Sequence, residues 1–361
     1  MRVGFLGGGQ LARMMALSGI PLGIGSVFLD PASDACAGVA GELIVDAYDS
    51  ADGLDRLAAA ADVVTFEFES VPATSAERLA SHVAVHPPPR ALEVAQDRLY
   101  EKQLFERLGI ETTGFRPVDS QADLDEAARA GVLKTRRLGY DGKGQRVLAD
   151  ARDAAGAFDD LGGVPLLFED MVRFDRELSA IAVRGQDGDV RCYPLVENHH
   201  AEGILRVTHA PAPDLTPHLQ ELGERYVAAV LDELDYVGVL ALELFQVGDR
   251  LLANEMAPRV HNSGHWTIEG AQTSQFENHL RAVCGLPLGD VAARGSSTMV
   301  NLIGTVPDEA AVLAVEGAHL HLYGKAPRLG RKLGHVTVTG GGDWRRIAEL
   351  AGAATAATTP R

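Results

Sequence analysis

The stretch that decides the fold is VGFLGGGQLA, residues 3–12. Val3–Leu6 is a short apolar run typical of a buried strand, Gly7–Gly9 is a tight turn, and a helical pattern follows. The glycines and Ala12 fit G-x-G-x-x-G/A, in which backbone N–H groups approach a phosphate, and Asp30 stands about where a ribose-binding acid is expected. Tight packing of strand against helix, with no dinucleotide, explains the same glycines, so both interpretations stay open at this point.

Outward from this unit, strands alternate with helices. Apolar runs at Ser26–Leu29 and Val63–Phe68 flank an alanine-rich helical segment around Leu54–Ala61. This alternation predicts a doubly wound parallel sheet. His86 and the three prolines after it cannot continue a helix or a central strand, so we place the first domain at residues 1–92.

The second region, residues 93–288, is predicted to begin with a helix that contains Gln96, Asp97, Arg98 and Lys102. Further strands are expected over residues 131–134, 146–148, 177–183, 190–196, 239–245 and 250–256, with a helix over 274–283. Glycine and proline at residues 285–289 mark its end. Residues 289–361 are predicted to form a small β-rich domain, with strands over residues 298–303, 319–323 and 334–339.

A glycine-rich loop, Gly139–Gln145, separates the first two strands of the second region. Its three glycines allow backbone N–H groups to converge on anionic oxygens, and Lys143 adds a cation. We therefore predict a mobile flap over a polyphosphate. A basic hairpin turn in solvent is the alternative, although it accounts poorly for the cations at 134, 136 and 137.

Glu243 and Glu255 lie in two apolar strands joined by Gly248-Asp249, which predicts a hairpin. Two carboxylates on one face of neighbouring strands repel each other unless a cation lies between them. With Asn254, they offer the oxygen ligands that Mg²⁺ prefers, and phosphate oxygens can complete the coordination. The alternative is an edge hairpin whose glutamates face solvent.

Two more segments are rich in groups that bind anions. Arg259 opens a run that also contains His261, Asn262, Ser263, Gly264 and His265, and its guanidinium can hold an oxyanion with two hydrogen bonds. We expect the two histidines to be polar or core residues rather than metal ligands. Lys325, Arg331 and Lys332 lie among glycines and predict a phosphate clamp, with a solvated basic face as the alternative.

Charge excludes one class of partner. The 361 residues include 33 Lys+Arg and 50 Asp+Glu, a net charge of −17, which disfavours nucleic acid because its phosphates need a basic footprint. The three cysteines form no C-x-x-C pair, so we expect a reducing, cytoplasmic compartment. We also expect no membrane association, since neither a signal peptide nor an apolar run of about 18 residues is apparent.

Several motifs together resemble those of the ATP-grasp carboxylate–amine ligases, and within them the N5-carboxyaminoimidazole ribonucleotide synthetases of purine biosynthesis. The resemblance spans nearly the whole chain, and its most specific parts are residues 259–266 and 324–335. One departure is Leu138, where the resemblance leads us to expect glycine. The segments that carry it are residues 7–11, 66–69, 96–98, 134–137, 139–145, 197–200, 203–205, 254–266 and 323–335.

The resemblance implies a three-domain ATP-grasp fold, with mixed α/β and α+β content, in a cytoplasmic homodimer. The implied reaction is the carboxylation of 5-aminoimidazole ribonucleotide by bicarbonate through carboxyphosphate, with ATP converted to ADP and phosphate. Mg²⁺, or Mn²⁺ in its place, is implied at Glu243 and Glu255. Asp141 would orient the amine or accept its proton, Arg259 would orient bicarbonate, and Lys325 completes the implied catalytic set.

The resemblance also implies the residues that contact each substrate. The ATP contacts are Arg98, Lys134, Gly139, Tyr140, Asp141, Gly142, Lys143, Gly144, Gln145, Glu169, Asp170, Met171, Val172, Glu177, His200, Asn254 and Glu255. The ribonucleotide contacts are Gln10, Leu11, Glu69, Lys325, Arg331 and Lys332. All substrates are anions, so we expect six cations to converge on one cleft, namely Arg98, Lys134, Lys143, Arg259, Lys325 and Arg331.

Two other functions remain open on the sequence. A nicotinamide-dependent oxidoreductase would rest on Gly7, Gly9, Ala12 and Asp30, but it leaves the flap and the glutamate hairpin without a role. A sister ATP-grasp ligase that acts on another ribonucleotide would use the same machinery. A relative that only binds nucleotide is disfavoured, because Lys134, Glu243 and Glu255 are all present.

Overall fold

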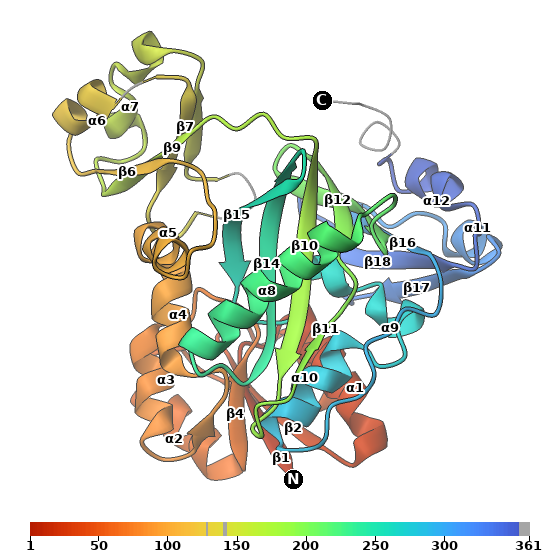
Figure 1. Ribbon diagram of the computed structural model, residues 1–361. Coiled ribbons are helices and arrows are strands. Elements are labelled where there is room, and N and C mark those ends of the chain that lie inside the picture. Colours follow the sequence, from red (N-terminus) through yellow and green to blue (C-terminus); the bar gives the residue numbers. More distant parts are fainter. Residues whose placement is uncertain (128, 140–142, 354–361) are drawn as a thin grey trace.

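The computed structural model describes residues 1–127, 129–139 and 143–353, whose strands form three sheets (Figure 1). The N-terminal sheet has the order β3-β2-β1-β4-β5, and its four strand pairs are all parallel. This confirms the predicted doubly wound sheet. Its strands are β1 (Arg2–Leu6), β2 (Gly25–Asp30), β3 (Glu42–Val45), β4 (Val63–Phe66) and β5 (Ala84–Val85). Its helices are α1 (Gln10–Gly19), α2 (Ala51–Ala60), α3 (Ala73–Ala80) and α4 (Pro89–Gln96).

A four-stranded sheet with the order β6-β9-β7-β8 forms a separate lobe, which lies at the upper left of Figure 1. Its hairpin β7–β8 carries the predicted flap, with Lys134 opposite Gln145. The strands of this lobe are β6 (Phe115–Val118), β7 (Gly131–Thr135), β8 (Gln145–Leu148) and β9 (Leu166–Asp170). Its helical segments are α6 (Gln121–Ala127), η3 (Ala151–Ala154) and α7 (Ala157–Asp160).

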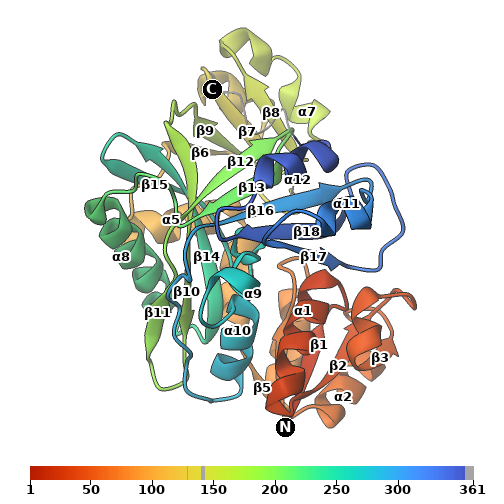
Figure 2. The same ribbon diagram turned by 90° about the vertical axis from the view of Figure 1, so that its right-hand side faces the viewer.

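A nine-stranded sheet, β15-β14-β10-β12-β13-β16-β18-β17 with β11 beside β10, spans the rest of the chain. Figure 2 shows the last strands continuing it, so the β-rich C-terminal region shares this sheet. Its strands are β10 (Arg176–Arg184), β11 (Val190–Cys192), β12 (Val196–Ala201), β13 (Ile204–Ala210), β14 (Gly238–Val247), β15 (Arg250–Ala257), β16 (Ser297–Ile303), β17 (Ala318–Leu322) and β18 (Lys332–Thr339). The helices packed around it are α5 (Arg98–Arg107), α8 (Pro217–Glu233), α9 (Thr267–Gly270), α10 (Gln275–Val283), α11 (Glu309–Leu313) and α12 (Trp344–Leu350).

Two local predictions are corrected by the structure. The strand expected over residues 190–196 is split between β11 and β12, and Pro194, which has no N–H for a ladder, lies in the break. The helix expected across Gln96 and Lys102 is two helices, because Asp97 has extended backbone and caps α5 by accepting a hydrogen bond from the N–H of Leu99 at 3.1 Å.

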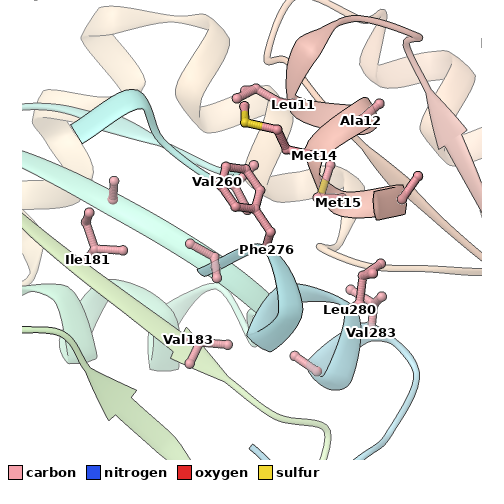
Figure 3. Close-up of a cluster of buried hydrophobic side chains, with 14 of the residues drawn as sticks. Leu11, Ala12, Met14, Met15, Ile181, Val183, Val260, Phe276, Leu280 and Val283 are labelled. Carbon is pink, nitrogen blue, oxygen red and sulfur yellow. The ribbon is translucent and has the colours of Figure 1, made fainter. Parts of the chain in front are cut away.

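One apolar core joins the N-terminal sheet to the large sheet. Figure 3 shows Met14 and Met15 of α1 beside Phe276 and Leu280 of α10, and all four side chains are buried. Each such side chain contributes about 1.5–3 kcal/mol by leaving water. This packing fixes the start of α1, and so the position of Gln10, relative to the strands of the large sheet.

Within the described part of the chain, no helix has both the length and the apolar character needed to cross a membrane.

Candidate active site

A cleft of about 780 Å³ receives residues from all three parts of the fold, and its size suits a small-molecule ligand. The first part contributes the start of α1 and the segment after β4, and the second contributes the entry to the flap. The large sheet contributes the β14–β15 hairpin and the loop after it. Among the residues that line the cleft are Gln10, Leu11, Glu67, Glu69, Arg98, Glu101, Gly139, Glu243, Glu255, Arg259, His261, Asn262 and Lys332.

Glu243 and Glu255 are direct partners in the register of β14 and β15, as the predicted hairpin requires. The Nη1 atom of Arg98 lies 2.8 Å from Oε2 of Glu255, and Nε2 of His261 lies 3.1 Å from Oε1 of Glu243. Burial alone would raise the pKa of Glu255, but Arg98 outweighs it and lowers the pKa to about 2. Glu255 is therefore charged at neutral pH, and it faces a second carboxylate in the cleft.

Lys134 of β7 reaches across from the small lobe to the large sheet. Its Nζ lies 3.0 Å from Oε2 of Glu169 on β9 and 3.4 Å from Oδ1 of Asn254 on β15. The other carboxylate oxygen of Glu169, Oε1, is buried and has no hydrogen-bond partner among the described residues. This corner therefore offers a cation and an unused acceptor side by side, as a ligand with both phosphate and amino groups requires.

Other residues predicted to contact ATP lie on or next to β9, β10 and β12. Asp170, at the end of β9, pairs with Arg129, and Met171 beyond it is exposed. Glu177 of β10 and His200 of β12 form an ion pair, and Glu177 raises the pKa of His200 although burial opposes this.

The flap hairpin is held where it meets the cleft. The N–H of Thr135 donates to the carbonyl of Gly144 at 2.7 Å, and Nη2 of Arg98 donates to the carbonyl of Gly139 at 3.2 Å. Gly144 has a φ of 69°, which glycine adopts without strain. Tyr140, Asp141 and Gly142 lie outside the described residues, so the predictions made for them stay predictions.

Arg259 lies against Glu69 deep in the cleft. Its Nε donates to the Glu69 carboxylate, and Nη1 donates to the carbonyl of Val260 at 3.1 Å. Burial would raise the pKa of Glu69, but the charge of Arg259 outweighs it and lowers the pKa to about 2. Both amide atoms of Asn262 are buried without a partner among the described residues, which marks a position where a polar ligand can bind.

At the far side of the cleft, Nζ of Lys325 donates to Oε1 of Gln10, so the C-terminal loop meets the start of α1. Lys332 lines the cleft, whereas Arg331 donates to the carbonyl of Ala326 in its own loop at 3.1 Å. Of the six cations expected to converge, the structure places Arg98 and Arg259 on the cleft wall. Lys325 bonds to Gln10 of that wall, and Lys134 bonds to Asn254, which precedes the wall residue Glu255. Arg331 bonds to its own loop, and Lys143, in the flap, is exposed.

Glu67 is a residue of the cleft to which the sequence assigned no role. Its carboxylate accepts hydrogen bonds from the N–H groups of Gly9 at 2.5 Å and of Leu11 and Ala12 at 3.1 Å each. These are the groups that a dinucleotide phosphate would need. The Glu67 carboxyl therefore already occupies the start of α1, and the glycines serve packing, since a Cβ at Gly7 or Gly9 would overlap Glu67. Burial raises the pKa of Glu67.

Two other residues near the cleft, Glu101 and Asp97, received no role from the sequence. His261 and His265 are both buried, and both line the cleft, with His261 beside Glu243. Glu101 of α5 is buried against the cleft, where burial and the charge of Glu255 raise its pKa to about 8. Asp97 binds the guanidinium of Arg136 at 2.7 Å and so ties α5 to the flap strand.

The sequence matches the models of three protein families along its length. Residues 1–96 match the ribonucleotide synthetase preATP-grasp domain, residues 103–276 the ATP-grasp domain, and residues 297–346 the phosphoribosylaminoimidazole carboxylase C-terminal domain. Among named relatives, N5-carboxyaminoimidazole ribonucleotide synthase of Pseudomonas aeruginosa is 56% identical over 342 residues, covering 94% of each chain. Its namesake in Brucella melitensis is 48% identical, covering 93% of this chain and 95% of its own.

Solved structures give the same result. N5-carboxyaminoimidazole ribonucleotide synthetase of Thermus thermophilus superposes with a TM-score of 0.93 at 54% identity, covering 96% of this chain and 98% of its own. N5-carboxyaminoimidazole synthase of Aspergillus clavatus, solved in complex with ADP and 5-aminoimidazole ribonucleotide, superposes with a TM-score of 0.89 at 30% identity and 98% coverage of both chains.

Proposed function

The chain belongs to the N5-carboxyaminoimidazole ribonucleotide synthetase family of ATP-grasp ligases, and we propose which part of its cleft binds each substrate of the family's reaction. The chain carries out the ATP-dependent carboxylation of 5-aminoimidazole ribonucleotide to N5-carboxyaminoimidazole ribonucleotide in purine biosynthesis. The observation that carries the assignment is the pair Glu243 and Glu255, which face each other beside Arg98 at the junction of the three sheets.

ATP is assigned to the side of the cleft between the small lobe and β15. Lys134 and Arg98 contact its phosphates, and the flap from Gly139 to Gln145 covers them. The unpartnered Oε1 of Glu169 accepts a hydrogen bond from the amino group of adenine, and residues 170–172 form the hinge beside the base. The pair of Glu177 and His200, together with Asn254, lies along the ribose and the phosphates.

Mg²⁺ is assigned to Glu243 and Glu255. No group of three or more acidic, histidine or cysteine ligands occurs among the described residues, so protein side chains alone do not supply a full set. Two carboxylates completed by phosphate oxygens suit Mg²⁺, which binds few protein ligands and prefers oxygen. When bound, the ion neutralises charge that develops on the transferred phosphoryl group.

Bicarbonate is assigned to the corner formed by Arg259 and Asn262. The guanidinium of Arg259 holds the anion, and the buried amide of Asn262 supplies a donor and an acceptor. From this position a bicarbonate oxygen attacks the γ-phosphorus of ATP in line, which gives carboxyphosphate and ADP. A closed flap excludes water until the carboxyl group reaches the amine of the ribonucleotide.

The ribonucleotide is assigned to the side of the cleft formed by the start of α1 and the C-terminal loop. Lys325, Lys332 and Arg331 hold its 5′-phosphate, and Gln10 and Glu69 bind the ribose or imidazole. Leu11 forms apolar wall, since its side chain is buried and its N–H is bonded to Glu67. Asp141 orients the exocyclic amine or accepts its proton, and the carbamate nitrogen–carbon bond then forms as phosphate leaves.

We further propose four properties of the whole protein. It functions as a cytoplasmic homodimer that requires Mg²⁺, or Mn²⁺ in its place. Its domains are residues 1–92, 93–288 and 289–361, although the third shares a sheet with the second.

One assay tests the function against its rivals. Release of ADP is measured with ATP and bicarbonate, with and without 5-aminoimidazole ribonucleotide. Stimulation by that ribonucleotide, and by no other amino-bearing ribonucleotide, is expected, and its absence would contradict the assignment. Binding of NADH, followed by its fluorescence, is not expected, because Glu67 occupies the place that a dinucleotide phosphate would take.

A further inference from the structure

Lys102 is the most deeply buried cation beside the proposed ATP site, with a side chain only 1% exposed. Its Nζ donates to Oγ1 of Thr112 at 2.9 Å, to Oγ1 of Thr113 at 3.4 Å and to the carbonyl of Ala253 at 3.2 Å. An ammonium group has three N–H donors, and these three acceptors use all of them. The reaction assigned above leaves Lys102 without a role.

Two lysines share one carboxylate at this point. Oε2 of Glu169 lies 3.0 Å from Nζ of Lys134 and 3.6 Å from Nζ of Lys102. Burial alone would raise the pKa of Glu169, but Lys102 and then Lys134 outweigh it and lower the pKa, so the carboxyl is charged. Burial lowers the pKa of Lys102, and the charge of Glu169 opposes this shift. With both lysines protonated, the two ammonium groups and the one carboxylate carry a net charge of +1.

The two lysines differ in what else they can reach. The other hydrogen bond of Lys134 goes to Asn254, a neutral side chain, and 11% of the Lys134 side chain is exposed. Lys102 lies behind it and has no comparable access. The surplus positive charge is therefore available to a ligand only through Lys134.

We propose that Lys102 is a positioning residue that neutralises Glu169, so that the charge of Lys134 remains available to the phosphates of ATP. The proposal rests on the assignment of Lys134 to those phosphates. Without Lys102, Lys134 and Glu169 form a closed, neutral pair in a poorly solvated corner, where their attraction is strong. An incoming phosphate then meets a neutral pair, with no surplus positive charge to bind it.

The test compares ligands that differ only in their phosphates. Dissociation constants of ATP and adenosine are measured by calorimetry for the full-length protein and for Lys102→Met. We expect the ATP constant to rise about tenfold or more, as for loss of a charged hydrogen bond, while the adenosine constant is unchanged. Lys102→Met with Glu169→Gln removes both charges and is expected to return the ratio of the two constants to within about threefold of wild type.

A purely structural Lys102 gives a different result. Adenosine and ATP would then weaken together, or the double variant would not recover the ratio, and either outcome would overturn the proposal. Arg107→Met removes an exposed cation from the same helix and is the matched control, with no change expected in the ratio.

Two further variants keep the test decisive. If Lys102→Met does not fold, Glu169→Gln alone is measured. This variant removes the carboxylate and keeps both ammonium groups, so ATP is expected to bind, relative to adenosine, at least as tightly as in wild type. A shift in favour of adenosine would refute the counter-charge role. Lys134→Met tests separately whether Lys134 binds the phosphates of ATP. An unchanged ratio of the ATP and adenosine dissociation constants in that variant would show that it does not, whatever the role of Lys102.

Discussion

Glu243 and Glu255 stand directly opposite each other on β14 and β15, and each has its own nitrogen-bearing neighbour. Arg98 comes to Glu255 from α5, and His261 comes to Glu243 from the loop that follows β15. Two facing carboxylates in a cleft cost free energy unless positive charge balances them. The pair is therefore best explained as a site that is completed by a ligand.

Glu255→Gln is expected to abolish turnover while leaving the protein folded. The amide keeps the shape of the side chain but removes the charge that the proposed Mg²⁺ site needs, so a loss of at least a hundredfold, about 2.7 kcal/mol in the barrier, is expected in kcat. ADP release under saturating substrates measures this. Circular dichroism checks the fold.

Glu111→Gln is the matched control, because Glu111 lies in the connection between α5 and β6 and pairs with β15 of the same hairpin. Glu111 binds Arg250 of β15 in an exposed ion pair, and such pairs contribute about 0–1 kcal/mol, so near wild-type turnover is expected. A Glu255→Gln variant that turns over as fast as this control would refute the metal assignment.

Lys325→Ala is expected to raise the KM for 5-aminoimidazole ribonucleotide about tenfold or more, with a smaller change in the KM for ATP. Lys325 approaches Gln10 on the ribonucleotide side of the cleft, and loss of a charged hydrogen bond to phosphate costs about 1.5–3 kcal/mol. Arg346→Ala removes an exposed cation from the C-terminal region and is expected to leave both constants unchanged. Equal ribonucleotide KM values in the two variants would exclude Lys325 from the phosphate clamp.

The glutamate hairpin was predictable because its cause is local. Two apolar runs with one glutamate each, joined by Gly248-Asp249, fix both the pairing and the shared face. The parallel N-terminal sheet was predictable for a similar reason, since the alternation of strand and helix is written along the chain.

Glu67 and Lys102 were not predictable, because their roles depend on segments far apart in the sequence. Glu67 reaches the start of α1 only because β4 lies beside β1 in the sheet. Lys102 lies in the charged sequence RLYEKQLFER, which is typical of an exposed helix, and only the docking of α5 against β15 buries it. No periodicity in the chain reports such a contact.

Leu138, at the entry to the flap, has a φ of 64° and is 81% exposed. A side chain in the left-handed region costs about 1–2 kcal/mol, which Gly avoids and Ala does not. We therefore expect Leu138→Gly to have a free energy of unfolding higher than that of Leu138→Ala by about 1 kcal/mol, measured by urea denaturation.

The same two substitutions at Leu329 are the control for this prediction. Leu329 is also exposed, but its φ is not positive, so alanine is expected to be the more stable there by about 0.4–1 kcal/mol. The same order of stability at both positions would mean that the backbone of residue 138 is not strained.

His279 predicts a loss of stability in acid. The N–H of Val239 donates to Nδ1 of His279 at 3.1 Å, so the ring proton must be on Nε2, which lies 2.8 Å from Oγ1 of Thr65. The imidazole is neutral in this arrangement and ties α10 to β14 and β4. Burial, with a smaller contribution from His86, lowers its pKa to about 3.

The sign of the effect follows from this pKa. Between about pH 6.5, where histidine titrates in the unfolded chain, and pH 3, the unfolded chain binds a proton that the folded protein excludes, so stability falls as the pH falls. From pH 7 to pH 5 the loss from this one residue is about 2 kcal/mol. His279→Gln, which does not titrate, is expected to be less stable at pH 7 but to lose about 2 kcal/mol less on going to pH 5. Urea denaturation at both pH values measures the difference, and parallel losses in the two proteins would show that His279 takes up its proton in the folded state.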